Sequence, residues 1–166
     1  MIDTVGGTRV TSPDPLLDAF DTVTAEVFDA IAVVLERCDD HTVNAVPDAP
    51  GVNSVFALVT HIDGMIGYWG GSFAAGEAIP RDRDAEFRAR GTVEQARELL
   101  LRARTRLPGW AAAARTDGIR GRAATGTTRR DTATATPEFV LLHILRELAQ
   151  HAGHLQICAD LVIRGR

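Results

Sequence analysis

The 166-residue sequence has no lysine, only two cysteines and no uncharged apolar run long enough to cross a membrane. All 18 basic residues are arginine and the formal net charge is −4, so the composition does not favour nucleic-acid binding. The first residues lack the basic and apolar regions of a secretory signal. We therefore expect a cytoplasmic protein without a membrane span, in which Cys38 and Cys158 are free thiols.

Several catalytic motifs are also missing. There is no Gly-x-x-x-x-Gly-Lys phosphate loop, no Cys-x-x-Cys pair and no Gly-x-Ser-x-Gly nucleophile elbow. The sequence therefore gives no indication of a P-loop nucleotide site, a paired-thiol site or an α/β-hydrolase.

Apolar residues recur at helical spacing in four segments, and capping residues mark where these helices begin. Residues 1–12 are expected to be a flexible tail and residues 13–166 a single domain. The first predicted helix follows Ser12-Pro13-Asp14-Pro15 and runs from Leu16 to about Arg37, and the second runs from Asn53 or Ser54 to near Gly76. The third begins at the Thr92–Gln95 capping box and ends at Arg106 or beyond Ala114, with a kink or break expected at Pro108-Gly109. The last begins at Thr136-Pro137 and ends at about Ile163.

Three connections separate these helices. Residues 41–50 are proline-containing, residues 79–91 are charged, and residues 116–135 are rich in threonine, arginine and glycine. Arg81 and Arg83 in the charged connection either bind an anionic substrate or are simply solvated. No strand or internal repeat is evident, so we expect an all-α, antiparallel four-helix bundle with a long loop before the last helix.

The last helix carries one polar stripe within otherwise apolar surroundings. Since its other faces are apolar, we expect the whole helix to be buried, where unpaired carboxylates and imidazoles are costly to desolvate. A metal ion would offset that cost, because Glu and His four residues apart project toward one point. The stripe consists of His143, Glu147, Gln150, His151, His154 and Cys158.

The metal hypothesis combines His61 of the second helix with Glu147 and His151 of the last. Three protein ligands leave a position open for water or substrate, as in catalytic sites. The alternatives are a hydrogen-bonded core histidine at His61 and a metal-free hydrogen-bonded pair of Glu147 with His151. If the three residues share a cation, the imidazoles of His61 and His151 must lie within about 8 Å and face inward.

Three further residues of the stripe have open roles. His154 either supports the ligands from outside or replaces Glu147 as a ligand. His143, two turns before His151, is expected to support the site or to pack between helices. Cys158 is a small buried thiol or a ligand for a soft metal.

The chain from about Pro13 to Val162 resembles the DinB-like superfamily, and in particular its actinobacterial mycothiol-dependent branch, which includes maleylpyruvate isomerase. The resemblance is carried by three segments: Ser54–Trp69 with its histidine and following aromatic residues, the charged Arg83–Phe87 stretch, and Leu141–His154. It implies a four-helix bundle, often a homodimer, that holds a divalent metal, zinc or alternatively nickel. The implied ligands are His61, Glu147 and His151, with His154 where many relatives have glutamine.

The resemblance further implies a metal-dependent S-transferase or isomerase that combines mycothiol or a similar thiol with a small-molecule electrophile. A divalent cation lowers the pKa of a bound thiol or water, which produces a nucleophile near neutral pH. Two other functions stay open: a non-catalytic homodimeric helical protein with a structural His/Glu network, and a metal-dependent hydrolase.

Overall fold

The computed structural model describes residues 13–127, 129 and 132–165, so the predicted tail of residues 1–12 lies outside the described residues. The all-helical class is confirmed, and no strand occurs in the described ranges. Short 3₁₀ turns, η1 and η3, cover Thr42–Asn44 and Thr132–Thr134. The helices are α1 (Pro15–Glu36), α2 (Val55–Ile66) continued by the π-helix η2 (Gly67–Ala75), α3 (Arg83–Glu86), α4 (Val93–Asp117) and α5 (Pro137–Arg164).

Each long helix begins at a side chain that accepts a hydrogen bond from its first turn. Asp14 caps α1, Ser54 caps α2 and Thr136 caps α5. Thr92 and Gln95 form a reciprocal capping box at the start of α4. These caps satisfy backbone N–H groups that have no partner within the helix, which is why the four starting points were predictable.

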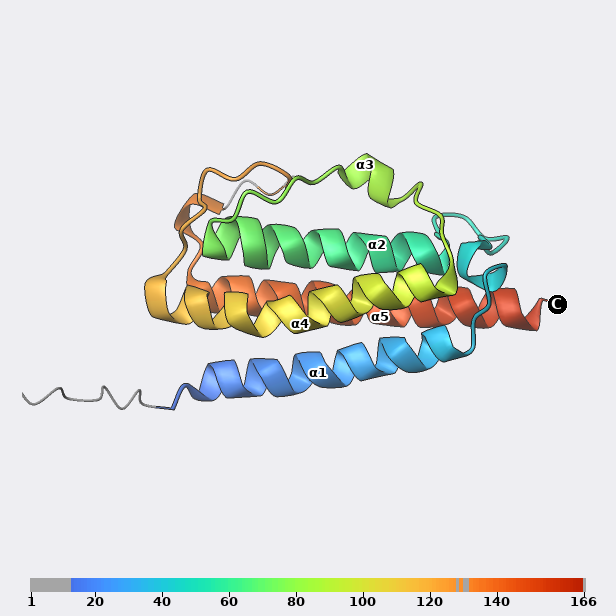
Figure 1. The fold of residues 1–166 in the computed structure, drawn as a ribbon, viewed down its shortest axis with the longest axis horizontal. Helices are drawn as coiled ribbons and strands as arrows, with labels where there is room; N and C mark the ends of the chain where they lie inside the picture. Colours follow the sequence, from blue (N-terminus) through green and yellow to red (C-terminus); the bar gives the residue numbers. More distant parts are fainter. Residues whose placement is uncertain (1–12, 128, 130–131, 166) are drawn as a thin grey trace, which may run out of the picture.

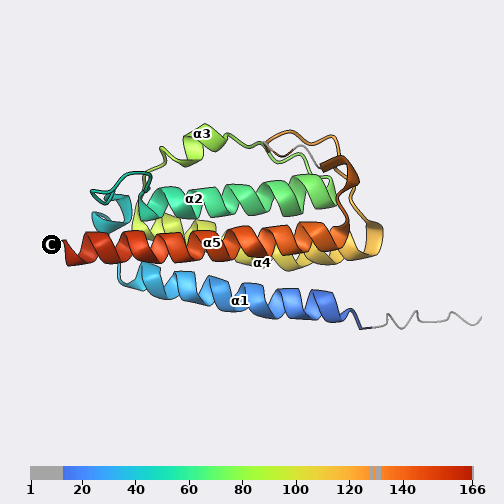
Figure 2. The same cartoon turned by 180° about the vertical axis from the view of Figure 1, so that it is seen from behind.

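The four long helices lie side by side, but their directions do not alternate along the chain (Figures 1 and 2). α1 and α5 run in one direction, whereas α2 and α4 run in the other. Antiparallel neighbours are therefore α1 with α4 and α2 with α5, while the consecutive helices α2 and α4 are parallel. This differs from the expected alternation because the connection 76–92 travels back along the bundle before α4 begins, and it carries α3 past α2.

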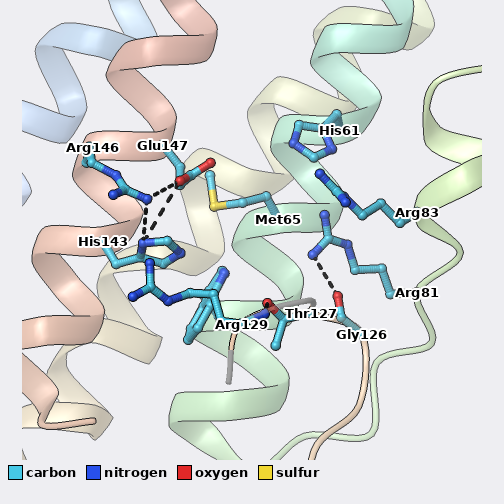
Figure 3. Close-up of a pocket in the computed structure, with 11 residues that line it drawn as sticks. His61, Met65, Arg81, Arg83, Gly126, Thr127, Arg129, His143, Arg146 and Glu147 are labelled. Atoms are coloured by element: carbon cyan, nitrogen blue, oxygen red, sulfur yellow. Dashed lines mark hydrogen bonds and ion pairs between the residues drawn. The ribbon is translucent and has the colours of Figure 1, made fainter. Parts of the chain in front are cut away.

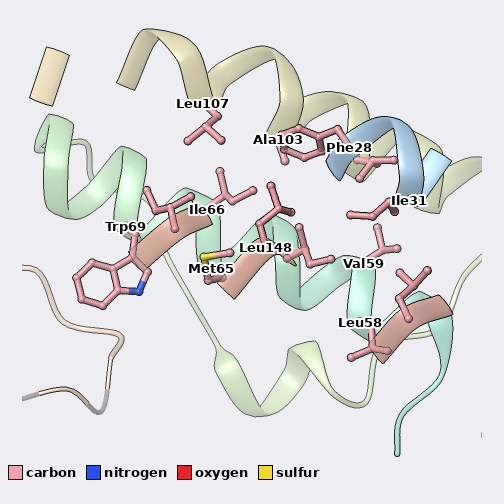
Figure 4. Packing of buried hydrophobic residues seen from close by; sticks show 14 of the residues in the cluster. Phe28, Ile31, Leu58, Val59, Met65, Ile66, Trp69, Ala103, Leu107 and Leu148 are labelled. Carbon is pink, nitrogen blue, oxygen red and sulfur yellow. The ribbon is translucent and has the colours of Figure 1, made fainter. Parts of the chain in front are cut away.

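α2 is the most enclosed helix of the bundle. Nine of its 12 residues are buried, and Figure 4 shows Leu58, Val59 and Ile66 packed among residues of the other long helices. α4 and α5 pack against it, and α3 covers a further side. The prediction that the last helix is buried on all sides is wrong, because α5 packs inward on one face only. Its outer face exposes Leu142, Ile157 and Leu161.

The widened turns of η2 are packed closely against α4. A side chain at Gly70 would place its Cβ 2.8 Å from the Trp110 ring, and one at Gly71 would lie 2.3 Å from Ile79. The helix then ends at Gly76, whose φ of 77° is in the left-handed region. Glycine at these positions allows the helix to approach its neighbours, and π-turns of this kind are frequent near functional sites.

The remaining differences from prediction lie in α4 and the connections. α4 continues through Pro108 to Asp117 without a break, which is the longer of the two expected extents. The charged connection contains the short helix α3, which was not among the predicted helices. Within the described ranges, no helix combines the length and apolar character that a membrane crossing requires.

Candidate functional site

α2 and α5 bring two histidines together inside the bundle. The Nε2 atoms of His61 and His151 lie 3.1 Å apart, and their rings meet edge to face with centroids 4.5 Å apart. His61 is 3% exposed, and His151 is partly buried. The two imidazoles are thus well within the separation expected for residues that share a cation, and both face inward.

Glu86 of α3 fixes the orientation of His61. Its Oε2 lies 2.7 Å from Nδ1 of His61, and its side chain is only 7% exposed. The ring of Phe87 stacks on the ring of His61, with 4.6 Å between their centroids. A carboxylate that holds Nδ1–H directs the opposite nitrogen of the ring into the site, as outer carboxylates do for metal-binding histidines.

Arg81 binds the Glu86 carboxylate through a bidentate pair of hydrogen bonds. Its Nε donates to Oε1 at 2.7 Å and its Nη2 donates to Oε2 at 3.1 Å. Nη1 of Arg81 donates to the Gly126 carbonyl at 3.2 Å, which ties the loop before α5 to the same network. Burial would raise the pKa of Glu86, but hydrogen bonds from His61 and Arg81 and the charge of Arg81 lower it overall. Glu86 is therefore ionised at neutral pH.

The ionised state of Glu86 constrains the protons of the histidine pair. A carboxylate only accepts, so Nδ1 of His61 carries a proton and donates it to Glu86. The facing Nε2 atoms of His61 and His151 then either share one proton in a hydrogen bond or both direct lone pairs at a cation. Either arrangement satisfies the buried imidazoles.

His151 is held in its neutral form. Burial of the ring is the largest cause that lowers the pKa of His151 from 6.5 to about 4, and the charge of His61 acts in the same direction. Glu147 opposes this effect, whereas nearby Arg83 adds to it. A neutral imidazole keeps a lone pair that can bind a metal at neutral pH.

Glu147, the third predicted ligand, lies beside the pair but is held by a neighbour. Its Oε2 is 3.6 Å from Nε2 of His151, while its Oε1 accepts a close hydrogen bond from Arg146. Burial would raise the pKa of Glu147, but this hydrogen bond and the surrounding positive charges lower it. Glu147 is therefore an ionised carboxylate with one oxygen close to His151.

The separation of the two imidazoles is compatible with a shared metal ion, but a third ligand is not in place among the described residues. With Zn–N bonds of about 2.0–2.1 Å, a separation of 3.1 Å between the Nε2 atoms corresponds to an angle of about 100° at the cation, near the tetrahedral value. Among the described residues, no three His, Cys, Asp or Glu side chains already surround one cation position. A three-ligand site on His61, His151 and Glu147 thus requires the Glu147 carboxylate to turn from Arg146 toward the histidines.

The other predicted residues of the stripe lie apart from the pair. His143 packs edge to face on Trp69 with centroids 4.4 Å apart, and its Nδ1 accepts a hydrogen bond of 3.1 Å from Arg146. His154 lies one turn beyond His151 and does not line the adjoining cavity. The thiol of Cys158 is buried, and burial raises its pKa.

A small cavity of about 150 Å³ opens beside His61 (Figure 3). Arg81 and Arg83 reach it from one side, and Arg146 with Glu147 from the other. Its apolar walls come from Met65 and Trp69 and its remaining lining from His143, Gly126, Thr127 and Arg129. The cavity gives a small molecule access to the region of the histidine pair.

Comparison with known families agrees with this architecture. The DinB superfamily model matches residues 25–155, which include α2, α3, α4 and most of α5. The chain belongs to the DinB superfamily. No curated protein and no solved structure shows a significant match. Within this DinB-superfamily chain, the matched range contains both histidines of the pair and Glu86.

Sequence reasoning missed the role of Glu86. Its segment, Arg83–Phe87, contributes to the family resemblance as a charged stretch, but nothing in the spacing of residues 61 and 86 indicates that they meet. Two local signals exist: Asp82 is a suitable helix cap, and Phe87 is an apolar residue in a polar connection. Both favour a short helix that packs on the bundle, but neither specifies its partner.

Proposed function

We propose that this protein is a metal-dependent enzyme that uses a low-molecular-weight thiol of the mycothiol type, as an S-transferase or isomerase. The observation that carries the proposal is the 3.1 Å approach of the His61 and His151 Nε2 atoms inside the bundle, next to an open cavity. Membership of the DinB superfamily, in which metal binding is frequent, supports it.

The proposed ligands are His61, His151 and Glu147, and zinc is the preferred ion, with nickel as the alternative. Glu86 retains the proton of His61 at Nδ1, so Nε2 is available to the metal. His151 is neutral at physiological pH because its pKa is about 4. When bound, the divalent cation would lower the pKa of a thiol that it coordinates, so that the thiolate forms near neutral pH.

The protein's own residues would position the second substrate. The electrophile would enter the cavity of about 150 Å³, whose apolar walls are formed by Met65 and Trp69. In a transfer reaction, sulfur forms a bond to the electrophilic carbon and the leaving group departs with its bonding pair. In an isomerisation, the thiol adds to a conjugated double bond and is eliminated again after rotation. In this proposal both substrates are small molecules and the protein is a homodimer.

Thiol transfer is tested with monochlorobimane as the electrophile and mycothiol as the thiol, in the presence of zinc. We expect the protein to accelerate formation of the fluorescent thioether, with release of chloride and of the thiol proton. The reaction should be lost in His61→Gln and retained in His41→Gln, since His41 is an exposed residue of the 41–50 connection. Equal rates for wild type and His61→Gln would contradict the proposal.

A metal-free structural network is the second candidate, and one observation favours it. Arg146 donates a hydrogen bond to Oε1 of Glu147, and the Nε2 atoms of His61 and His151 are at hydrogen-bonding distance without a metal. Protein that takes up no ion in excess zinc would support this reading. Turnover of an ester without any added thiol would instead indicate a hydrolase.

A further inference from the structure

A second and larger cavity lies between α2 and α4. Its volume is about 320 Å³, compared with about 150 Å³ for the cavity beside His61, and the two cavities share no lining residue. At 100° per residue, Asp63 and Gly67 of the larger cavity lie on the side of α2 that faces away from His61. The larger cavity is therefore separate from the histidine pair.

Gly67 leaves space in this cavity that a side chain could occupy without a collision. An added Cβ would contact only Ile79, at 3.6 Å, which is an ordinary van der Waals distance. At Gly70, in contrast, a Cβ would lie 2.8 Å from the Trp110 ring. Alanine is a better helix former than glycine and would fit at position 67, so close packing does not account for this glycine. Its effect is to keep the space beside Ile79 open.

Trp110 forms an aromatic wall of the cavity and is held in one orientation. Its indole N–H donates to Oε1 of Glu77 at 2.7 Å, and Gly70 lies close to its ring. Ile79 and Pro80 add apolar lining from the connection that passes over this part of the bundle. A fixed aromatic wall with apolar neighbours favours a flat apolar ligand.

The charges around the cavity leave one cation unmatched. Among the lining residues that the structure describes, the charged ones are Asp63, Arg102 and Arg106. Arg102 donates to both carboxylate oxygens of Asp63, so these two charges offset each other. Arg106 forms no ion pair within the described ranges, and its guanidinium carbon lies 5.7 Å from the centroid of the Trp110 ring. A guanidinium over an aromatic face keeps the N–H donors at its edge available for an anion.

We infer that this cavity is a second binding site, and that its ligand is an aromatic anion. The ring system would lie against Trp110 and Gly67, and the anionic group would accept hydrogen bonds from Arg106. A cavity of about 150 Å³ holds benzene, so about twice that volume accommodates two fused rings. This site goes beyond the proposed function and requires no metal.

Naphthalene-2-sulfonate and naphthalene-2-sulfonamide are suitable probes, because they share a ring system and differ in charge. Each is titrated into ¹⁵N-labelled protein. The chain has two tryptophans, so the indole N–H signals of Trp110 and Trp69 report separately on the two cavities. The sulfonate should shift the signals of the Trp110 indole and the Gly67 amide. Shifts centred instead on Trp69 would overturn the inference.

The charge of the ligand is tested by the difference between the two probes. Arg106 is exposed, and an exposed ion pair contributes little, so the sulfonate should bind about three- to fivefold more tightly than the sulfonamide. Arg106→Gln should remove this preference. Arg83→Gln should preserve it, since Arg83 packs on Phe87 in a similar way but lines the other cavity. Equal affinities of the two probes in wild type, or the same loss in both variants, would contradict a role for Arg106.

Gly67→Ala tests the space itself, with Gly153→Ala as the matched control. The added Cβ at Gly153 of α5 has nothing within 4 Å, and Gly153 does not line the cavity. Affinity for both probes should fall about tenfold in Gly67→Ala, because one extra methyl group in a fitted site is poorly tolerated, and should be unchanged in Gly153→Ala. Urea unfolding should show that both variants are folded. Wild-type affinity in a folded Gly67→Ala protein would contradict the inference.

Repeating the titrations with EDTA separates this inference from the proposed function. Binding of the sulfonate at Trp110 should be the same with and without zinc. A protein that binds the sulfonate there but takes up no zinc keeps this site and loses the metal centre. A protein that takes up zinc but shows no shift at Trp110 keeps the metal centre and overturns this inference.

Discussion

Gly64 leaves the space that the Glu86 carboxylate occupies. A Cβ at position 64 would lie 2.1 Å from Oε1 of Glu86 and 2.8 Å from its carboxyl carbon. Gly64 is one turn after His61 on α2, so the absence of a side chain there allows Glu86 to reach His61 Nδ1. Glycine usually destabilises a helix interior, but at position 64 its missing side chain is what allows Glu86 to contact His61.

Replacement of Gly64 by alanine should therefore destabilise the protein. Alanine favours a helix interior by up to about 1 kcal/mol, but displacement of Glu86 leaves buried polar groups of His61 and Arg81 without partners, at about 1–3 kcal/mol. Gly109→Ala is the matched control, because nothing lies within 4 Å of its added Cβ. Urea unfolding should show Gly64→Ala below wild type and Gly109→Ala at or above it. The prediction is wrong if Gly64→Ala is as stable as Gly109→Ala.

Glu86→Gln tests the carboxylate itself with little change of shape. The variant leaves the buried guanidinium of Arg81, whose side chain is 6% exposed, without its countercharge, so we expect a loss of roughly 3 kcal/mol in unfolding free energy. Zinc affinity should fall about 10–100-fold, because the carboxylate no longer orients His61.

Glu138→Gln serves as the control for that substitution. Glu138 pairs with Arg115 on the surface, where such pairs contribute at most about 1 kcal/mol. Calorimetric titration with zinc and urea unfolding of both variants provide the comparison. Equal zinc affinity in Glu86→Gln and Glu138→Gln would exclude a role for Glu86 in positioning His61.

The low pKa of His151 predicts how stability depends on pH in the metal-free protein. The unfolded chain binds a proton at His151 near pH 6.5, whereas the folded protein binds it only near pH 4. Stability is therefore highest above pH 6.5 and is lost as the pH falls from 6.5 toward 4, by an amount on the order of 3 kcal/mol.

His151→Gln should flatten this dependence. Urea unfolding with EDTA at several pH values between 7 and about 5 avoids the range in which the carboxylates Glu86 and Glu147 titrate. The wild type should lose stability steadily over this interval, and the variant should lose less. An identical slope in the two proteins would show that His151 is not held neutral by the fold.

Local sequence signals predicted much of the fold. The caps at Ser54, Thr92 and Thr136 are interactions within one helical turn, so sequence spacing alone locates them. The direction of α4 relative to α2 was not predictable in this way, since it depends on the path of the connection 76–92. The cover that α3 provides over α2 follows from the same path.

The site was predictable only in part, for a related reason. His61 and His151 were expected to meet because each lies on a long helix with many apolar neighbours, and the structure places them together. Glu86 was missed because its contact with His61 depends on tertiary packing and on the missing side chain of Gly64. The position of Glu147 also depends on its hydrogen bond from the neighbouring Arg146. The four-residue spacing of Glu147 and His151 does not reveal that Arg146 competes with the histidines for this carboxylate.

The central claim is that His61 and His151 bind one divalent ion, and the zinc content of the purified, zinc-equilibrated protein tests it most directly. We expect about one zinc per chain in wild type and in His41→Gln, and loss of most of the zinc in His61→Gln and His151→Gln. Wild-type protein without zinc, or full zinc content in both site variants, would contradict the account.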